Sequence, residues 1–143
     1  MSEGPEKHWV SVAGAVLDDT GRILAIRRRD NNRWEPPGGI LELDEGIHEG
    51  LIREISEETG LRVSPIALCG VYKNMRRGIV ALVFRCGVVS GRPLSTEEAA
   101  EVRFLTPDEV RELMDEAYAC RLLDALEEGV SIRTHDGVSL LSG

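Results

Sequence analysis

The chain has 143 residues, of which 42% are hydrophobic and 29% charged, the composition of an ordinary soluble protein with one core. Its formal net charge of −8 argues against binding nucleic acid polymers or anionic membranes through its own charge. No apolar run reaches the roughly 18 residues of a membrane span. Cys69, Cys86 and Cys120 form no CxxC pair, so neither a disulfide framework nor a thiolate metal site is indicated. We therefore expect one cytoplasmic domain covering residues 1–143, with buried cysteines.

The N-terminal part predicts two strands after a flexible lead-in at residues 1–8. Residues 10–17 are apolar and rich in β-formers, and residues 22–28 show a second apolar run. The sequence Asp-Asp-Thr-Gly at 18–21 is typical of a turn, so the two strands are predicted to form a hairpin. Residues 31–39 are predicted as a loop, because their consecutive prolines and glycines exclude a helix or a central strand.

A helix is predicted over residues 44–59. Ile47, Leu51, Ile52 and Ile55 form an apolar stripe at helical spacing. Gly60 follows at the position where a left-handed backbone commonly ends a helix.

The second half predicts strands at residues 66–72, 78–89 and 102–105. Thr106-Pro107-Asp108-Glu109 then combines an N-cap Thr, Pro at N1 and Glu at N3, so a helix starts here. It is expected to reach residue 128 with room for one break.

The last residues, 129–143, contain a His-Asp-Gly turn and form either a terminal hairpin or a loose tail. The order of strands, helix, strands and helix predicts an α/β (α+β) sandwich with a mixed sheet between helices.

Three glutamates of the first helix indicate a metal site. Glu54, Glu57 and Glu58 are spaced i, i+3, i+4, which puts their carboxylates on one face, where they repel each other. Hard divalent cations relieve this repulsion, and Mg²⁺ prefers carboxylate oxygens and bridges to substrate phosphates. The alternative for such a helix is a solvated acidic surface.

The flanking residues favour the metal site. The string GILELDEGIHEGLIREISEETGL, from Gly39 to Leu61, resembles the Nudix box, G-x5-E-x7-R-E-U-x-E-E-x-G-U, at every position. Trp34 before Pro36-Pro37-Gly38-Gly39 resembles the entry loop of Nudix hydrolases, with Pro36 where a bulky apolar residue is usual. The resemblance is to the MutT-like branch and covers about residues 8–128. It implies the Nudix fold, an α/β/α sandwich around a central mixed sheet.

The resemblance also implies roles for the residues of the box. Mg²⁺, or Mn²⁺, would be bound by Glu57, Glu58 and the Gly38 carbonyl, with Glu54 as a further ligand or as the base that activates water. Arg53 would pair with Glu45 and hold the loop against the helix. The structural positions of the box are Gly39, Glu45 and Gly60.

A base on a distal loop also occurs in this family. Glu98 is the favoured candidate for it, and Glu97 and Glu101 remain open. Arg53, Glu54 and Glu98 are thus the predicted catalytic residues.

Substrate-binding residues are predicted from charge and aromatic character. The candidates are Arg27, Arg29, Trp34, Lys73 and Arg76. Strand alternation would put Arg27 and Arg29 on one face. Further basic candidates are Arg28, Arg33 and Arg77, and Trp9 and Tyr72 are further aromatics for stacking on a base.

The resemblance implies Mg²⁺-dependent cleavage of a phosphoanhydride bond in a nucleoside diphosphate-linked compound. Nucleoside triphosphates, giving a monophosphate and pyrophosphate, are favoured because signatures of ADP-ribose and dinucleoside polyphosphate hydrolases are absent beyond the box. ADP-ribose or a nucleotide sugar is the alternative substrate. The alternative from another class is a non-catalytic nucleotide sensor, although such modules usually lose a box glutamate. A monomer and a homodimer are both open.

Overall fold

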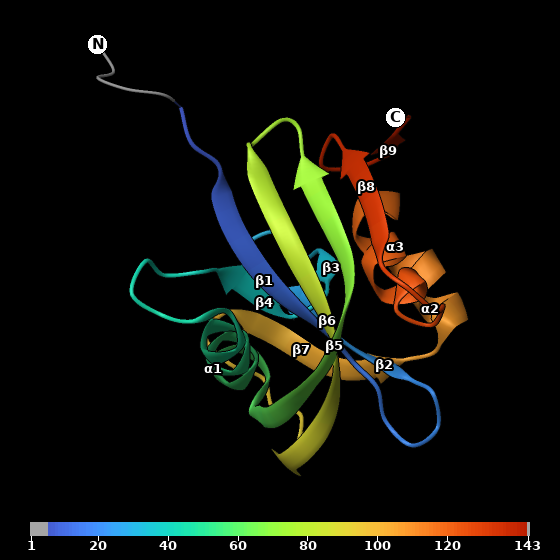
Figure 1. The fold of residues 1–143 in the computed structure, drawn as a ribbon. Coiled ribbons are helices and arrows are strands. Elements are labelled where there is room, and N and C mark those ends of the chain that lie inside the picture. The colour runs from blue at the N-terminus through green and yellow to red at the C-terminus, as the bar shows by residue number, and fades with distance from the viewer. Residues whose placement is uncertain (1–5, 143) are drawn as a thin grey trace.

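The computed structural model describes residues 6–142 and has three layers, helix, sheet and helix (Figure 1). In chain order the elements are β1 (Trp9–Val16), β2 (Ile23–Arg28), β3 (Trp34–Glu35), β4 (Gly38–Ile40), α1 (Ile47–Thr59), β5 (Leu61–Asn74), β6 (Ile79–Gly91), β7 (Ala99–Leu105), α2 (Pro107–Leu113), α3 (Glu116–Asp124), β8 (Ser131–His135) and β9 (Leu140–Leu141). The described residues contain no helix long and apolar enough to span a membrane.

The central sheet is mixed, as predicted. Its six strands run in the order β4-β1-β6-β5-β8-β9. The β1–β6 and β5–β8 pairs are parallel, and β5 and β6 are antiparallel. A second, antiparallel sheet of β3, β2 and β7 was not predicted from the sequence.

The predicted hairpin of the first two strands is wrong. β1 and β2 meet only at an isolated bridge between Leu17 and Ile23, and they belong to different sheets. The edges of β1 are occupied by β4 on one side and β6 on the other. Neighbouring side chains of β1, such as Val12 and Ala13, are both buried, as expected of a strand with both faces covered.

Two apolar clusters separate the layers. On one face of the sheet, Leu51 and Ile55 of α1 pack with Val12, Val63 and Phe84. On the other face, residues of α2 and α3 pack against β1, β2, β5 and β6. Cys69, Cys86 and Cys120 are free thiols buried in these clusters, as predicted.

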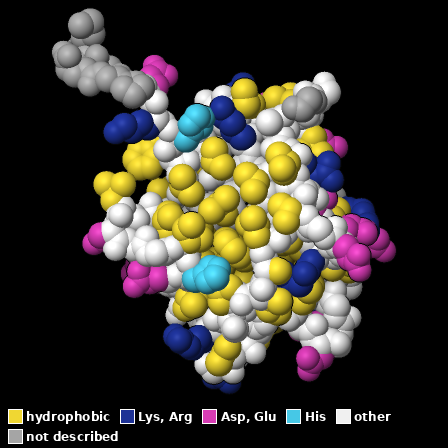
Figure 2. All heavy atoms as spheres, in the orientation of Figure 1, with side chains coloured by type: hydrophobic (Ala, Val, Ile, Leu, Met, Phe, Trp, Pro, Cys, Tyr) yellow, Lys and Arg dark blue, Asp and Glu magenta, His cyan; other side chains and the backbone are white. Residues whose placement is uncertain are grey.

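Part of the sheet face beside α1 carries no helix. Figure 2 shows hydrophobic side chains gathered there. Ile132, which is paired with Val71 in the sheet, is 81% exposed.

Several predicted boundaries shift in the structure. The first helix begins at Ile47 and not at 44, because the Gly46 N–H is capped by the Glu49 carboxylate at 3.0 Å. It ends as predicted at Gly60, whose φ is 79°. The predicted loop 31–39 contains β3 and the start of β4, an edge strand, which glycine tolerates.

Strand β5 extends beyond its predicted limits at both ends, and β6 extends beyond its predicted C-terminal end, because the two strands pair with each other almost throughout. Strand β7 starts at Ala99, before the predicted 102, because its first residues pair with the end of β2.

The C-terminal predictions hold with two adjustments. The capping box is present, with Glu109 N donating to Thr106 Oγ1 at 3.2 Å and Thr106 N to Glu109 Oε1 at 2.9 Å. The helical segment breaks once, before α3, and ends at Asp124 instead of 128, ahead of a turn in which Gly129 has a φ of 84°.

Strands β8 and β9 form the terminal hairpin, and β8 joins the sheet beside β5. Of the expected lead-in, residues 6–8 are exposed and outside any strand or helix, whereas residues 1–5 lie outside the described part, as does residue 143.

Candidate active site

The glycine pair of the box fixes the entry loop against both the sheet and α1. The Gly38 N–H donates to Glu58 Oε1 at 2.6 Å. A Cβ on Gly38 would collide with the carbonyl oxygen of Val12 in β1, and one on Gly39 would lie 2.5 Å from the Glu54 carboxylate. Glycine is therefore needed at both positions to bring the loop backbone up to the carboxylates.

Glu58, Glu54 and Glu98 form a cluster of like charges. Glu58 is 2% exposed, and burial raises the pKa of its carboxyl to about 8, opposed by the Gly38 hydrogen bond and reinforced by Glu54 and Glu98. Burial likewise raises the pKa of Glu54, an effect that neighbouring Arg53 opposes. The Glu98 carboxylate lies close enough to raise the pKa of both Glu54 and Glu58 by charge repulsion. The ionisation of Glu54 and Glu58 is thus disfavoured in this site.

The loop before β7 places Glu98 beside this cluster. The Leu94 N–H donates to the carbonyl of Thr59 at 2.9 Å, and Thr96 Oγ1 donates to that of Glu58 at 3.1 Å. The Glu98 carbonyl accepts from the Arg29 N–H at 3.0 Å. These contacts tie the loop to the C-terminal end of α1 and to the end of β2.

The other two acidic candidates of this loop have different surroundings. Glu101 is paired with Arg27, whose Nε lies 3.1 Å from Glu101 Oε1. Glu97 is exposed. Of the three acidic candidates for the distal base, Glu98 is thus the one that the structure brings to Glu54 and Glu58.

Arg53 links the acidic residues of the loop and the helix. It binds Glu45 through two hydrogen bonds, from Nε at 2.9 Å and from Nη2 at 2.6 Å, which is the expected pairing. Its Nη1 lies 3.1 Å from Glu54 and 3.2 Å from Glu57. The hydrogen bonds from Arg53 lower the pKa of Glu45 to about 2. A single guanidinium therefore orients both the loop carboxylate and two carboxylates of α1.

The donor set fits a hard divalent cation. Glu54 and Glu58 present carboxylate oxygens in a partly desolvated site beside Glu98, and the crowding of these charges is what a cation would relieve. Within residues 6–142, as the side chains stand in the structure, no group of three or more His, Cys, Asp or Glu side chains is arranged to hold a metal ion. Glu57 is turned toward Arg53 and its side chain is 60% exposed, so it is free to change rotamer.

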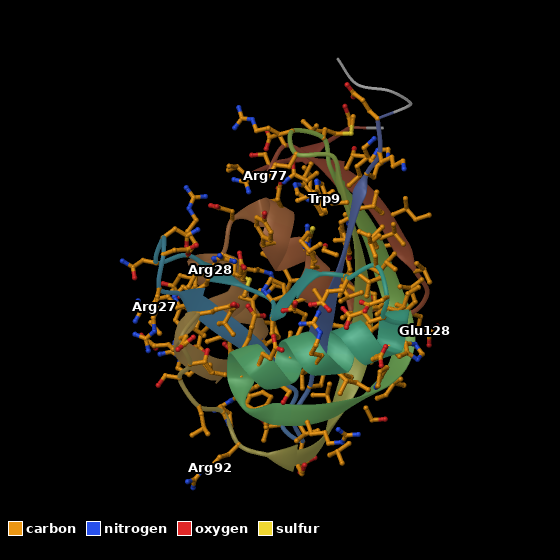
Figure 3. All side chains as sticks on the ribbon, turned by 90° about the vertical axis from the view of Figure 1, so that its left-hand side faces the viewer. Trp9, Arg27, Arg28, Arg77, Arg92 and Glu128 are labelled. Carbon is orange, nitrogen blue, oxygen red and sulfur yellow. The ribbon has the colours of Figure 1, made fainter. Side chains whose placement is uncertain are left out.

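A cleft of about 700 Å³ opens beside Gly38 and Gly39, a volume suited to a nucleotide. Its walls come from the ends of β2 and β4, the β5–β6 turn, α3 and the β8–β9 turn. In Figure 3, Arg28 and Arg77, which both line this cleft, lie above α1. The cleft therefore joins the glycine loop to a basic region.

The structure places the predicted substrate-binding residues unequally. Arg76 lines the cleft, whereas Arg27, Arg29, Trp34 and Lys73 do not. Arg27 pairs with Glu101, the Nε of Arg29 donates to the carbonyl of Thr96, and Arg103 lies over the ring of Trp34. Those four side chains remain candidates by prediction alone.

The alternative basic candidates Arg28, Arg33 and Arg77 do line the cleft. Arg28 is the last residue of β2 and follows Arg27 directly, so the strand face opposite to the one favoured from the sequence borders the cleft.

Sequence reasoning missed several polar residues of the cleft wall. Among them are Asn74, Tyr118, Arg121 and Asp136. They come from β5, α3 and the β8–β9 turn, which meet only in the folded chain. No spacing or motif within one segment signals such a meeting.

Comparison with known proteins agrees with the fold and the box. The model of the NUDIX domain family matches residues 7–125. A MutT-like protein of Streptomyces ambofaciens is 56% identical over 138 residues, covering 96% of this chain and 90% of that protein. An ADP-ribose pyrophosphatase of Methanocaldococcus jannaschii is 32% identical over 104 residues, covering 68% of this chain and 62% of that protein.

A solved NUDIX hydrolase of Nitrosomonas europaea superposes with a TM-score of 0.77 at 20% identity, covering 92% of this chain and 82% of that one. The α/β/α sandwich predicted from the sequence is thus the fold of this chain. The chain belongs to the Nudix family and is a Nudix hydrolase.

Proposed function

We propose that the protein hydrolyses a phosphoanhydride bond of a nucleoside triphosphate, releasing a nucleoside monophosphate and pyrophosphate, with Mg²⁺ as its cofactor. One observation carries the proposal. The carboxylates of Glu54, Glu58 and Glu98 gather at the glycine loop, and that loop lines a cleft of nucleotide size.

The cation would be held by oxygen ligands of α1 and the entry loop. We assign Glu54, Glu57, Glu58 and the Gly38 carbonyl to it, in agreement with the ligand chemistry of Mg²⁺. When bound, the cation would polarise the phosphoryl oxygens and offset their charge, and Mn²⁺ would serve as a substitute. Arg53 would act as a positioning residue, because it orients Glu45, Glu54 and Glu57 at once.

The reaction needs a group that takes a proton from water. A water oxygen attacks phosphorus, the bond from phosphorus to the bridging oxygen breaks, and the leaving phosphate oxygen keeps the electron pair. The proton passes to a carboxylate, which we assign to Glu98, with Glu54 as the alternative. Glu98 is favoured because it reaches the cluster from an exposed loop, where proton exchange with solvent is open.

The substrate assignment rests on the likeness to a MutT-like protein over nearly the whole chain. A second candidate is ADP-ribose, because the relative from Methanocaldococcus jannaschii carries the name ADP-ribose pyrophosphatase. Both substrates contain the same diphosphate unit and both would use the same carboxylates.

The test is turnover of a substrate panel by the purified protein with Mg²⁺. The panel contains canonical and oxidised nucleoside triphosphates, ADP-ribose, nucleotide sugars and dinucleoside polyphosphates. The products are separated by chromatography. Formation of monophosphate and pyrophosphate, abolished by a chelator, would support the proposal. Cleavage confined to ADP-ribose or a nucleotide sugar would contradict the substrate assignment. No turnover with either Mg²⁺ or Mn²⁺ would favour a nucleotide sensor.

Replacing individual glutamates by glutamine tests the roles assigned to them. Glu98→Gln is expected to lower kcat by about 100-fold or more, in the range of general-base catalysis, while Glu97→Gln keeps most of it. Equal effects of the two changes would contradict the assignment of the base. Glu57→Gln is expected to lose most turnover while staying folded, and unchanged turnover would contradict its role as a ligand.

A further inference from the structure

Arg121 is a buried cation at the wall of the cleft with little to bind. It is 8% exposed, it lies on α3, and it lines the same cleft as Gly38 and Gly39. Its Nε is buried and, within residues 6–142, has no hydrogen-bond partner. No carboxylate of the described residues lies within 4.0 Å of its guanidinium. A buried charge without a partner is costly, so a ligand of this group is to be expected.

The contact of Arg121 with His135 satisfies the guanidinium poorly. Nη2 of Arg121 lies 3.1 Å from Nε2 of His135, while the Gly137 N–H donates to Nδ1 of the same ring at 2.9 Å. A neutral imidazole has one acceptor nitrogen, and an arginine can only donate. Both ring nitrogens of His135 therefore face donors, and only one of the two contacts is a hydrogen bond.

Aromatic rings hold the guanidinium in place without consuming its hydrogen-bond donors. Arg121 lies 4.8 Å from the ring centroid of Tyr118 and 5.5 Å from that of Tyr72. Cation–π contacts of this kind stabilise the charge and fix its plane. Tyr118 itself lines the cleft, whereas Tyr72 is fully buried. The result is a preorganised donor fork beside an aromatic ring at the cleft wall.

We propose that Arg121 is a specificity-determining residue that binds two adjacent acceptor atoms at the end of the substrate away from the scissile phosphates. The proposal rests on the proposed function, since it assumes that the phosphates lie at Gly38 and Gly39. A nucleotide bound there extends into the remainder of the same cleft, where Arg121, Asn74 and Tyr118 form the wall.

Two substrate groups present such a pair of acceptors. The O6 and N7 atoms of guanine match an arginine fork, whereas adenine places an N6 donor beside N7 and is disfavoured. Two oxygens of a second phosphate would match it as well. In either case the substrate would supply the hydrogen-bond acceptors that Arg121 lacks within the protein.

The test is equilibrium binding of GMP, AMP and inorganic phosphate to the protein in a chelator, by calorimetry. The wild type is expected to bind GMP about 10- to 100-fold more tightly than AMP, the discrimination expected of one bidentate contact. Arg121→Met is expected to remove that preference, whereas Arg111→Met, at an exposed arginine of α2, keeps it. Tight binding of inorganic phosphate that Arg121→Met abolishes would identify the second-phosphate source. Equal affinities in wild type and Arg121→Met for all three ligands would overturn the proposal.

Three controls separate a recognition role from a structural one and from the proposed function. Because Arg121 lacks a carboxylate partner, Arg121→Met is expected to unfold at the same or a higher temperature, while a structural role would lower that temperature. Arg121→Lys, with a single donor group, is expected to lose the preference and stay folded. Glu57→Gln should keep the preference and lose turnover, so a failure of the metal assignment is seen independently of Arg121.

Discussion

Adding one methyl group at each glycine of the Gly38-Gly39 pair should separate stability from catalysis. At Gly38 the new Cβ meets the carbonyl oxygen of Val12 and the Cα of Ala13, which are backbone atoms of the paired strand β1 and cannot move aside. At Gly39 it meets the carboxylate of Glu54 at 2.5 Å, the far end of a flexible side chain. Neither glycine has a positive φ, so the effects are steric.

The expected changes in stability and in kcat depend on which atoms must move to make room for the new methyl group. Gly38→Ala is expected to lower the free energy of unfolding by about 2–3 kcal/mol, as overpacking against a fixed neighbour does. Gly39→Ala should stay within about 1 kcal/mol of the wild type, since alanine also reduces the entropy of the unfolded chain. It displaces Glu54, however, and a shift of about 1 Å at a reacting group is expected to cost about 100-fold in kcat.

Urea unfolding and steady-state turnover of both variants check this pair. The expected pattern is a destabilised Gly38→Ala and a stable Gly39→Ala whose kcat is low. If Gly39→Ala keeps wild-type kcat, Glu54 is not confined by the loop in the manner inferred. If it is destabilised as much as Gly38→Ala, the loop and not the carboxylate is the rigid partner.

Three further changes test the energetics of the buried polar groups. Glu58→Gln should raise the melting temperature measured in a chelator, because it removes a buried carboxylate crowded by Glu54 while keeping an acceptor for the glycine loop, and it should abolish the stabilisation that added Mg²⁺ gives the wild type. A lower melting temperature in the chelator would contradict this. His135 has its pKa lowered to about 4 by burial and by neighbouring Arg121, with Asp136 opposing, so the unfolded chain binds the extra proton first. Stability from this group is present above about pH 6.5 and lost as the pH falls toward 4, and urea titrations of His135→Gln should show a shallower loss in that window than the wild type. Tyr72→Phe removes the hydrogen bond from the phenol to Asp124 at 2.8 Å and should lower the unfolding free energy by about 1–2 kcal/mol in the same assay.

Local chemistry explains which features were predictable from the sequence. The stop at Gly60, the cap at Thr106 and the pairing of Arg53 with Glu45 all depend on residues within about a turn or two of each other, or on the box itself. The same holds for the acidic face of α1. These features need no knowledge of which strands meet.

The features that were missed depend on contacts between distant segments. A short turn after β1 is compatible with a hairpin. Residues 10–28 contain no signal that β4 and β6 occupy the two edges of β1. Arg121 belongs to the same category. Its environment is set by the packing of α3 against β8, which brings Arg121 next to His135. These two residues are 14 positions apart in the chain and belong to different elements.

The chain has a net charge of −8, so a phosphate-rich compound would be repelled unless positive charge is concentrated at the cleft. Two of the lining arginines are already committed, Arg28 to Asp30 and Glu35, and Arg33 to Asp115. The positive charge left for a ligand therefore lies with the other lining arginines, Arg76, Arg77 and Arg121, which have no salt bridge within the described residues.

The carboxylates of Glu54 and Glu58 lie at the glycine loop instead, where the proposed cation would offset their charge when phosphates approach. Under the proposed function, a substrate held at both places would be attracted to the protein's own cations at one end and to a recruited cation at the other. The box glutamates would then set the reaction, whereas the choice of substrate would depend on arginines that lie outside the box.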